Sequence, residues 1–389
     1  MDGFQTGVIA LIKSALTGEK ADIPENFDWD NVLKISKKHN IVPIIYYGIK
    51  NSSIKLSPEM EEKFSQIVLL GIMIDNNQEY EIRELRKIFT AKKIDFAPLK
   101  GIRLKKYFPK SEMRSMSDLD ILFRTDQINE VNHLMINRDY IFKTETDHVI
   151  ELSKNRFINL ELHKKLIPQT EAFGSYYKDC WQLFYPMENG SNEYIMNPSD
   201  EYIFLFLHFT KHYISGGVGI RQLLDLWVFS EKEKIDYTYV KSQLSSLNLD
   251  IFWENVHRTL SSWFGYEKAD EKTDFITEFI FSSGVFGNHK DYLIATAVKA
   301  HEDPDSAGKR KIFRLFFLPY SGMCVKYPIL KNHPVLLPLY WVIRWLNAII
   351  FKKKKGIMHL KEFSKISGSD IRTAIKEFNY VGLDFNFKE

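Results

Sequence analysis

The sequence predicts an α+β protein in which a small mixed sheet lies between two helical regions. Apolar residues keep a helical spacing over the first ninety residues and again after residue 199. The stretch between them holds short runs rich in Ile, Phe, Val and Tyr, several of which alternate with polar residues. We therefore expect an N-terminal helical region over 1–92, an α/β core over 93–195 and a C-terminal helical domain over 196–389.

The N-terminal region has the pattern of packed helices. Asp28 or Asp30 is expected to cap a helix over residues 32–38, and a long periodic segment begins near Pro58. No alternation of strand, turn and helix occurs before residue 93. The core follows, with a helix expected over residues 127–137 and strands in five runs: IDFAPLKG, LDILF, YIFKTET, HVIELS and FINLELHKKL.

The C-terminal domain begins with the run EYIFLFLHFTKHYI, for which Ser199 and Asp200 are the expected helix caps. Glycines 216–219 end this helix, and IRQLLDLWVF begins the next. Arg221 and Asp225 lie four residues apart in this second helix. That spacing predicts a structural ion pair between them.

The composition excludes several classes of protein. With 389 residues, 44% hydrophobic and 26% charged, the chain is not disordered, collagen-like or a coiled coil. A net charge of +3 disfavours an extended nucleic acid as partner. Two cysteines make no disulfide framework, and the first twenty residues lack a signal-peptide pattern, so a cytoplasmic location is expected.

Residues 334–351 form an almost wholly apolar run that ends at four lysines, 352–355. As a helix it would span about 27 Å at 1.5 Å per residue. Arg344 near its centre and Pro338 within it disfavour a membrane span. A buried helix is the favoured interpretation. The alternative is an interfacial helix that gives weak membrane-surface contact near Lys352.

The informative motif is Asp118-Leu119-Asp120. On a strand, both carboxylates would share one face while Leu119, Ile121 and Phe123 face the core. Adjacent carboxylates repel unless a cation lies between them, and Mg²⁺ takes one or two carboxylates together with phosphate oxygens. Mn²⁺ is the alternative ion. Taken alone, an Asp-x-Asp pair is more often a solvated surface turn.

A later strand offers a third carboxylate. Alternation in residues 157–163 places three apolar side chains on one face and Asn159, Glu161 and His163 on the other. Glu161 would complete a two-metal site of the kind that assists phosphoryl displacement. An edge strand with one solvated face explains the same pattern equally well.

Cationic and small residues flank these carboxylates. Gly101 permits a tight turn through which backbone N–H groups approach a phosphate, and Lys100 and Arg114 offer positive charge. Farther along, His208, Lys211 and His212 share one helix face and would point at a triphosphate. The alternative for that face is a surface sealed by hydrogen-bonded histidines.

The ordered motifs LKG, YFP, RSMSDLDILF and LELH resemble the nucleotidyltransferase superfamily, which has the DNA-polymerase-β-like fold. They are most similar to a bacterial branch described as uncharacterised nucleotidyltransferases. The similarity covers about residues 94–229, and this range includes a Gly-x-Arg-x-x-x-Asp stretch at residues 219–225. It implies that the metal is held by Asp118, Asp120 and Glu161. It implies that the nucleotide is bound by Lys100, Gly101, Arg114, Ser117, His163, His208, Lys211 and His212.

The expected function is metal-dependent transfer of a nucleoside monophosphate from an NTP to an acceptor hydroxyl or phosphate. The acceptor is left open among a small molecule, a glycan precursor, a protein side chain and an RNA end. Ile102 stands where the superfamily has a hydroxyl or a second glycine, so a catalytically inactive binding protein is the first alternative. The second is a glycosyltransferase using a sugar nucleotide, which would need a βαβ unit before the motif.

Overall fold

The computed structural model describes residues 1–168, 173–284, 327–351 and 368–384, together with residues 317, 320, 323 and 324. The chain divides into two compact units. One is formed by residues 1–213, 217–286 and 386–389, the other by residues 214–216 and 287–385. The first unit combines helices with a mixed five-stranded sheet and a small two-stranded sheet, which confirms the predicted α+β class.

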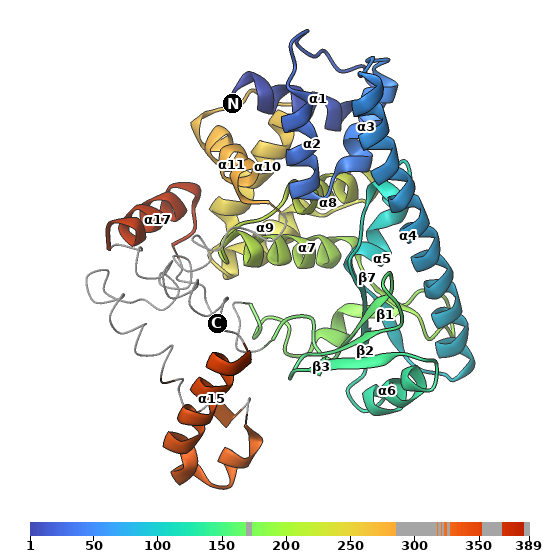
Figure 1. The fold of residues 1–389 in the computed structure, drawn as a ribbon, viewed down its shortest axis with the longest axis vertical. Coiled ribbons are helices and arrows are strands. Elements are labelled where there is room, and N and C mark those ends of the chain that lie inside the picture. The colour runs from blue at the N-terminus through green and yellow to red at the C-terminus, as the bar shows by residue number, and fades with distance from the viewer. Residues whose placement is uncertain are drawn as a thin grey trace. The chain divides into compact units, whose positions relative to one another are not determined.

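Four helices precede the sheet, and Figure 1 shows the longest of them running from the N-terminal helices to the strands. Asp28, one of the two residues predicted to cap the second helix, does so by accepting a hydrogen bond from the Asn31 amide. Ser57 caps the fourth, whose first turn holds Pro58 and two glutamates that suit a helix N-terminus. The helices are α1 (Gly3–Thr17), α2 (Trp29–His39), α3 (Val42–Asn51) and α4 (Pro58–Ala91).

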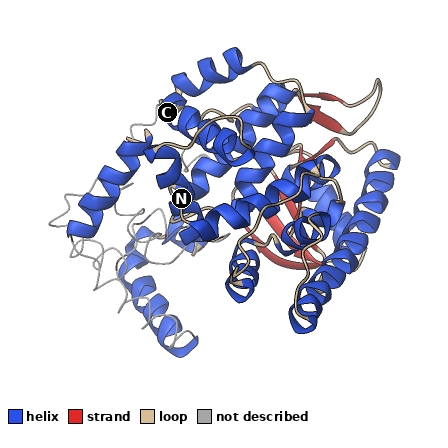
Figure 2. Ribbon diagram, turned by 90° about the horizontal axis from the view of Figure 1, so that it is seen from above, coloured by secondary structure: helices blue, strands red, loops and turns tan. Residues whose placement is uncertain are grey.

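The main sheet has the strand order β1-β2-β5-β4-β3, and Figure 2 shows its strands gathered in one region with helices beside them. Only β2 and β5 pair in parallel; the other neighbours are antiparallel. The strands are β1 (Phe96–Pro98), β2 (Leu119–Phe123), β3 (Ile141–Glu145), β4 (Val149–Ser153) and β5 (Asn159–His163), and α6 (Ile128–Ile136) follows β2.

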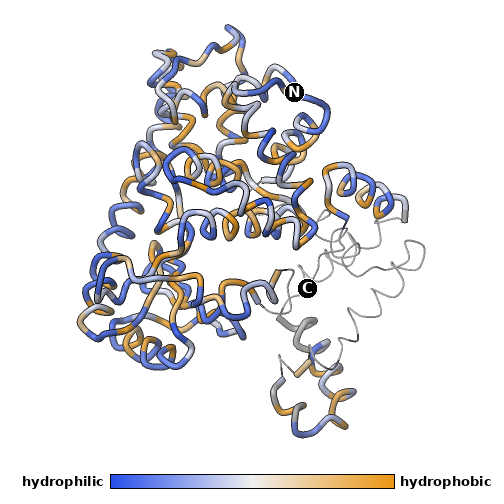
Figure 3. The backbone as a smooth tube through the Cα atoms, turned by 180° about the vertical axis from the view of Figure 1, so that it is seen from behind, coloured by the Kyte–Doolittle hydropathy of each residue, from blue (hydrophilic) through white to orange (hydrophobic). Residues whose placement is uncertain are grey.

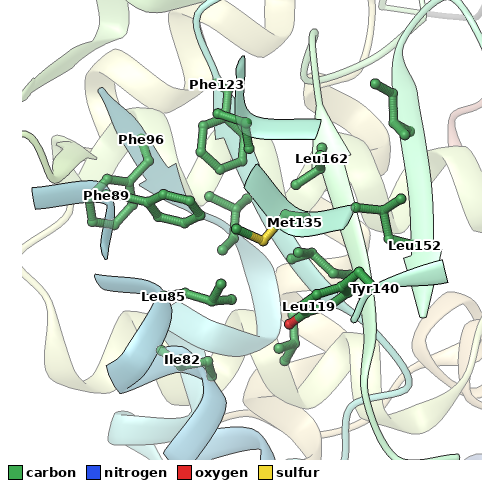
Figure 4. Close-up of a cluster of buried hydrophobic side chains, with 14 of the residues drawn as sticks. Ile82, Leu85, Phe89, Phe96, Leu119, Phe123, Met135, Tyr140, Leu152 and Leu162 are labelled. Atoms are coloured by element: carbon green, nitrogen blue, oxygen red, sulfur yellow. The ribbon is translucent and has the colours of Figure 1, made fainter. Parts of the chain in front are cut away.

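One face of this sheet packs against α4 and α6 to form the core drawn in Figure 4. Phe89 of α4 lies between two strand residues, with ring centroids 5.2 Å from Phe96 and 5.1 Å from Phe123. The alternation predicted for β2 and β5 is confirmed, because Leu119, Ile121, Phe123, Ile158, Leu160 and Leu162 all belong to this core. The polar residues of both strands therefore face the opposite side.

Helices resume after the small sheet of β6 (Phe184–Pro186) and β7 (Tyr194–Met196). The predicted cap of α7 was wrong by a few residues: the Asn197 side chain accepts from the Ser199 and Asp200 amides, because the helix already begins at Pro198. Figure 3 shows hydrophobic and hydrophilic residues alternating along these helices. They are α7 (Pro198–Tyr213), α8 (Ile220–Lys232), α9 (Tyr237–Ser246), α10 (Asp250–Phe264) and α11 (Glu271–Ser283).

The second unit contains α15 (Leu337–Phe351) and α17 (Gly368–Val381). The start of α15 packs on a small cluster of Met323, Cys324 and Leu330. Of the side chains described in this helix, Leu339 and Val342 are exposed and Trp341 is partly buried, so the predicted buried helix is only partly buried over residues 337–345. Among the described residues, no helix is long and apolar enough to cross a membrane. The lysines at 352–355, and with them the expected membrane-surface contact, lie outside the described residues.

His39 joins three helices of the first unit. Its Nδ1 accepts from the Ile220 amide at 3.1 Å, and its Nε2 donates to the Phe281 carbonyl at 3.2 Å. Burial lowers the pKa of His39 to about 4, and Lys38 beside it acts in the same direction. The imidazole is therefore neutral when the protein is folded.

We expect stability to fall as the pH drops from 6.5 towards 4, because the unfolded chain protonates His39 first. The loss from this residue is about 2–3 kcal/mol. Urea unfolding of wild type and His39→Gln at pH 7 and pH 5 measures it: the difference in stability between the two proteins should shrink at pH 5. An equal pH dependence in both would contradict the expectation.

Candidate active site

Parallel pairing of β2 with β5 brings the carboxylates together. Asp120 lies directly opposite Glu161 in the register of the two strands. Asp118 was predicted to lie on the same strand, but β2 begins at Leu119, so Asp118 occupies the turn just before it. Its side chain still reaches the same cavity as Asp120 and Glu161. The three carboxylates therefore converge, although only two of them are placed by strand alternation.

Two basic groups lie against this acidic cluster. The Lys100 ammonium donates to Asp120 Oδ1 at 2.7 Å, and His163 Nε2 lies 2.9 Å from the same oxygen. His163 Nε2 is also 3.1 Å from Glu161 Oε2. Burial alone would raise the pKa of Asp120, but Lys100 and His163 hold it well below its ordinary value. In turn, these carboxylates raise the pKa of Lys100 and of His163 against the effect of burial.

Asp118 has less compensation. Burial, followed by repulsion from Asp120 and Glu161, raises its pKa to about 6, and the Ser117 hydroxyl donates to it at 2.9 Å. An excess of carboxylate charge in one place favours a bound cation. Asp120, Glu161 and His163 each offer a ligand atom, and these atoms lie within 4.8 Å of one another. With Asp118, the set is dominated by carboxylate oxygens, which fits Mg²⁺ or Mn²⁺.

The turn between β1 and α5 (Lys100–Leu104) differs from the prediction. The residue in the left-handed region is Lys100, with φ +44°, whereas Gly101 has ordinary helical geometry. A Cβ at Gly101 would instead overlap the Met116 side chain, so a larger residue there would require that side chain to move. Ile102 belongs to the core behind the sheet, so the side chain at this position does not face the cavity.

Two arginines of the cavity wall bind the same backbone carbonyl, and one of them also binds a buried aspartate. Arg114 donates to both oxygens of Asp225, from Nε at 2.6 Å and from an Nη at 2.8 Å, and both side chains are buried. The predicted ion pair of Arg221 with Asp225 was therefore wrong, because Asp225 pairs with Arg114. Arg221 instead donates to the Ser115 carbonyl at 2.6 Å, which also accepts from Arg114 at 2.7 Å. The Ser115 carbonyl thus joins the two guanidinium groups.

Only some of the α7 residues that were expected to bind a nucleotide line the cavity. His208 and His212 lie one helical turn apart, with their Nε2 atoms 3.2 Å from each other. Burial, and then the charge of Lys100, hold the pKa of His208 well below its ordinary value, so this ring is neutral. Both histidines line the cavity, whereas Lys211 does not.

The cavity has a volume of about 240 Å³ and lies between the carboxylate strands and helices α7 and α8. Nine predicted residues line it: Lys100, Gly101, Arg114, Ser117, Asp118, Asp120, Glu161, His208 and His212. His163 lies behind Asp120 and Glu161 rather than in the lining. Five lining residues were not predicted as site residues: Met116, Leu205, Arg221, Gln222 and Asp225. The Gly-x-Arg-x-x-x-Asp stretch was the sequence signal that pointed to Arg221 and Asp225.

Comparison with known families agrees with this geometry. A family model described as "Uncharacterised nucleotidyltransferase" matches residues 25–265, which include every residue of the cavity lining. The chain belongs to this family. A search of curated proteins finds no match for the chain. The family defines a class of transferase whose chemistry involves nucleotides.

Removal of Asp225 should destabilise the protein strongly, because it leaves the buried Arg114 without its carboxylate. We expect Asp225→Ala to lower the free energy of unfolding by about 3–5 kcal/mol. Glu254→Ala is the matched control, since Glu254 pairs with Lys241 at 2.6 Å while both are about half exposed. Its loss should cost far less in the same urea titration, because solvent screens an exposed ion pair. Similar losses for the two variants would contradict a structural role for the Arg114–Asp225 pair.

Proposed function

We propose that the protein is a metal-dependent nucleotidyltransferase that moves a nucleoside monophosphate from an NTP to an acceptor. The observation that carries this is the convergence of Asp118, Asp120 and Glu161 at one end of a cavity whose other walls hold arginines and histidines. Membership of a nucleotidyltransferase family supports an NTP as the substrate. The acceptor would supply a hydroxyl or a phosphate, from a small molecule, a glycan precursor or a protein.

Asp118, Asp120 and Glu161 would hold Mg²⁺, with Mn²⁺ as an alternative. When bound, such an ion neutralises negative charge on the phosphates as the bond to the leaving group breaks. Lys100 adds a positive charge beside Asp120. His163 orients the carboxylates from behind, since its Nε2 contacts both Asp120 and Glu161.

The remaining residues would bind and orient the reactants. The acceptor oxygen attacks the α-phosphorus, the bond to the β-phosphate breaks, and pyrophosphate leaves. Glu161, which is partly exposed at the cavity, would orient the acceptor or take its proton. Arg114, Ser117, Gly101, His208 and His212 would contact the nucleotide, and Lys211 would add charge from outside the lining. Most of the catalysis would come from positioning and charge neutralisation.

A second candidate is a protein that binds a nucleotide and does not transfer it. The ion pair of Lys100 with Asp120 favours this candidate, because an internal cation already compensates a carboxylate that a metal would need. Ile102, packed in the core, also gives no hydroxyl to a phosphate. The glycosyltransferase alternative finds no support in the described residues, since only helices precede β1.

Calorimetry with ATP, GTP, CTP and UTP in the presence of Mg²⁺ tests the proposal. We expect wild type to bind at least one of these nucleotides and Asp118→Asn/Asp120→Asn to lose most of the Mg²⁺-dependent part of the affinity. The reason is that each of the two substitutions keeps the size of the side chain and removes the negative charge that would hold the ion.

Glu130→Gln is the matched control, because Glu130 is exposed on α6 and lies outside the cavity lining. It should bind as wild type does. Equal binding by wild type and the double variant would reject the metal-dependent enzyme. Mg²⁺-dependent binding with no transfer of label from the α-phosphate into a cell extract would favour the second candidate.

A further inference from the structure

Among the described residues, Arg221 of the cavity lining makes no hydrogen bond to a carboxylate. The other arginine of the lining, Arg114, takes both oxygens of Asp225, and Lys100 is bound to Asp120. In the described part of the chain, the hydrogen bond of Arg221 goes to the neutral Ser115 carbonyl. This wall of the cavity therefore holds two guanidinium groups and one carboxylate, and it carries an excess positive charge.

Two neighbouring polar atoms in the same wall also lack partners. Arg221 Nε and Gln222 Oε1 are buried and make no hydrogen bond in the described structure. Buried polar atoms are nearly always satisfied by protein, water or ligand, so these two adjacent atoms of one cavity are places where a polar ligand can complete the hydrogen bonding. A Gln amide can present either its oxygen or its NH₂ group to that ligand.

The surroundings of Arg221 favour an anion. Burial, and then repulsion by Arg114, lower the pKa of Arg221 to about 10, which means that its positive charge is poorly stabilised in the free protein. Arg221 and Gln222 also lie in the first turn of α8, at the positive end of the helix dipole. An anionic ligand would improve the environment of both guanidinium groups at once.

We propose that Arg221 and Gln222 form the binding site for the terminal phosphates of the nucleotide donor. This inference rests on the proposed function and names the donor class: a nucleotide whose terminal phosphates are free rather than capped by a sugar. Asp118 and Asp120 are close enough to Arg221 to act on its charge. A polyphosphate held at Arg221 would therefore extend towards the carboxylates that hold the metal.

The proposal predicts selective loss of polyphosphate affinity. We would measure binding of tripolyphosphate, ATP, AMP and UDP-glucose by calorimetry for wild type, Arg221→Gln and Arg221→Lys. Arg221→Gln should weaken tripolyphosphate and ATP by about 10- to 100-fold, the usual effect of lost charge-assisted hydrogen bonds. AMP should change less than threefold, because it has no terminal phosphates. Arg221→Lys should fall between, since it keeps the charge and loses the planar fork.

Arg83→Gln is the matched control, because Arg83 is exposed on α4 and outside the cavity lining. It should bind all four compounds as wild type does. Thermal unfolding of each variant separates a binding defect from a folding defect, and the comparison of AMP with ATP is made within one protein. If Arg221→Gln does not fold, the same ratio measured in Arg221→Lys decides.

Three results would overturn the proposal: no tripolyphosphate binding by wild type, an Arg221→Gln affinity within twofold of wild type, or equal weakening of AMP and ATP. Tighter binding of UDP-glucose than of ATP by wild type would also reject a donor with free terminal phosphates. These outcomes are distinct from failure of the proposed function. Arg221-dependent tripolyphosphate binding without nucleotide transfer keeps the phosphate site and removes the enzyme activity.

Discussion

The parallel pairing of β2 with β5 is the constraint on which the site depends. It places Asp120 and Glu161 at the same level on neighbouring strands, and Asp118 joins them from the turn before β2. Like charges held this close must be compensated. Lys100 and His163 supply part of that compensation through direct contacts with Asp120. Burial, and then repulsion from Asp120 and Glu161, raises the pKa of Asp118, so its charge is only partly compensated in the protein alone.

The core behind the sheet makes this arrangement rigid. The apolar residues that alternate with the carboxylates pack against α4 and α6, so a shift of one residue in either strand would bury a carboxylate in the core. Hydrophobic packing on one face thus fixes the charged pattern on the other. The left-handed backbone conformation of Lys100 costs about 1–2 kcal/mol of folding free energy for a residue other than glycine. The packing of the core offsets this cost.

The sequence predicted the fold class and nine of the residues that line the cavity. Alternation in LDILF and NLELH predicted which face each residue occupies, because a strand reports its own two faces through a period of two. The sequence alone could not identify the partner of Asp225. Arg221, four residues away on the same helix, is the local choice, whereas Arg114 lies 111 residues earlier and comes into contact only through the fold. The sequence also favoured Gly101 as the residue that makes the tight turn possible, because glycine usually occupies such positions. In the structure, Lys100 is the residue with a positive φ.

The long-range pair of Arg114 with Asp225 also ties together two parts of the candidate site. Arg114 donates to both oxygens of Asp225, which connects the loop before β2 to α8, and any contact of Arg114 with a nucleotide would be made by a guanidinium already held in this way. The Ser115 carbonyl extends that tie to Arg221. Arg114 therefore fixes the two walls of the cavity at a set spacing. Because Arg114 takes both oxygens of Asp225, the described hydrogen bond of Arg221 goes to a neutral carbonyl, and this is the reason for proposing a ligand anion as its partner.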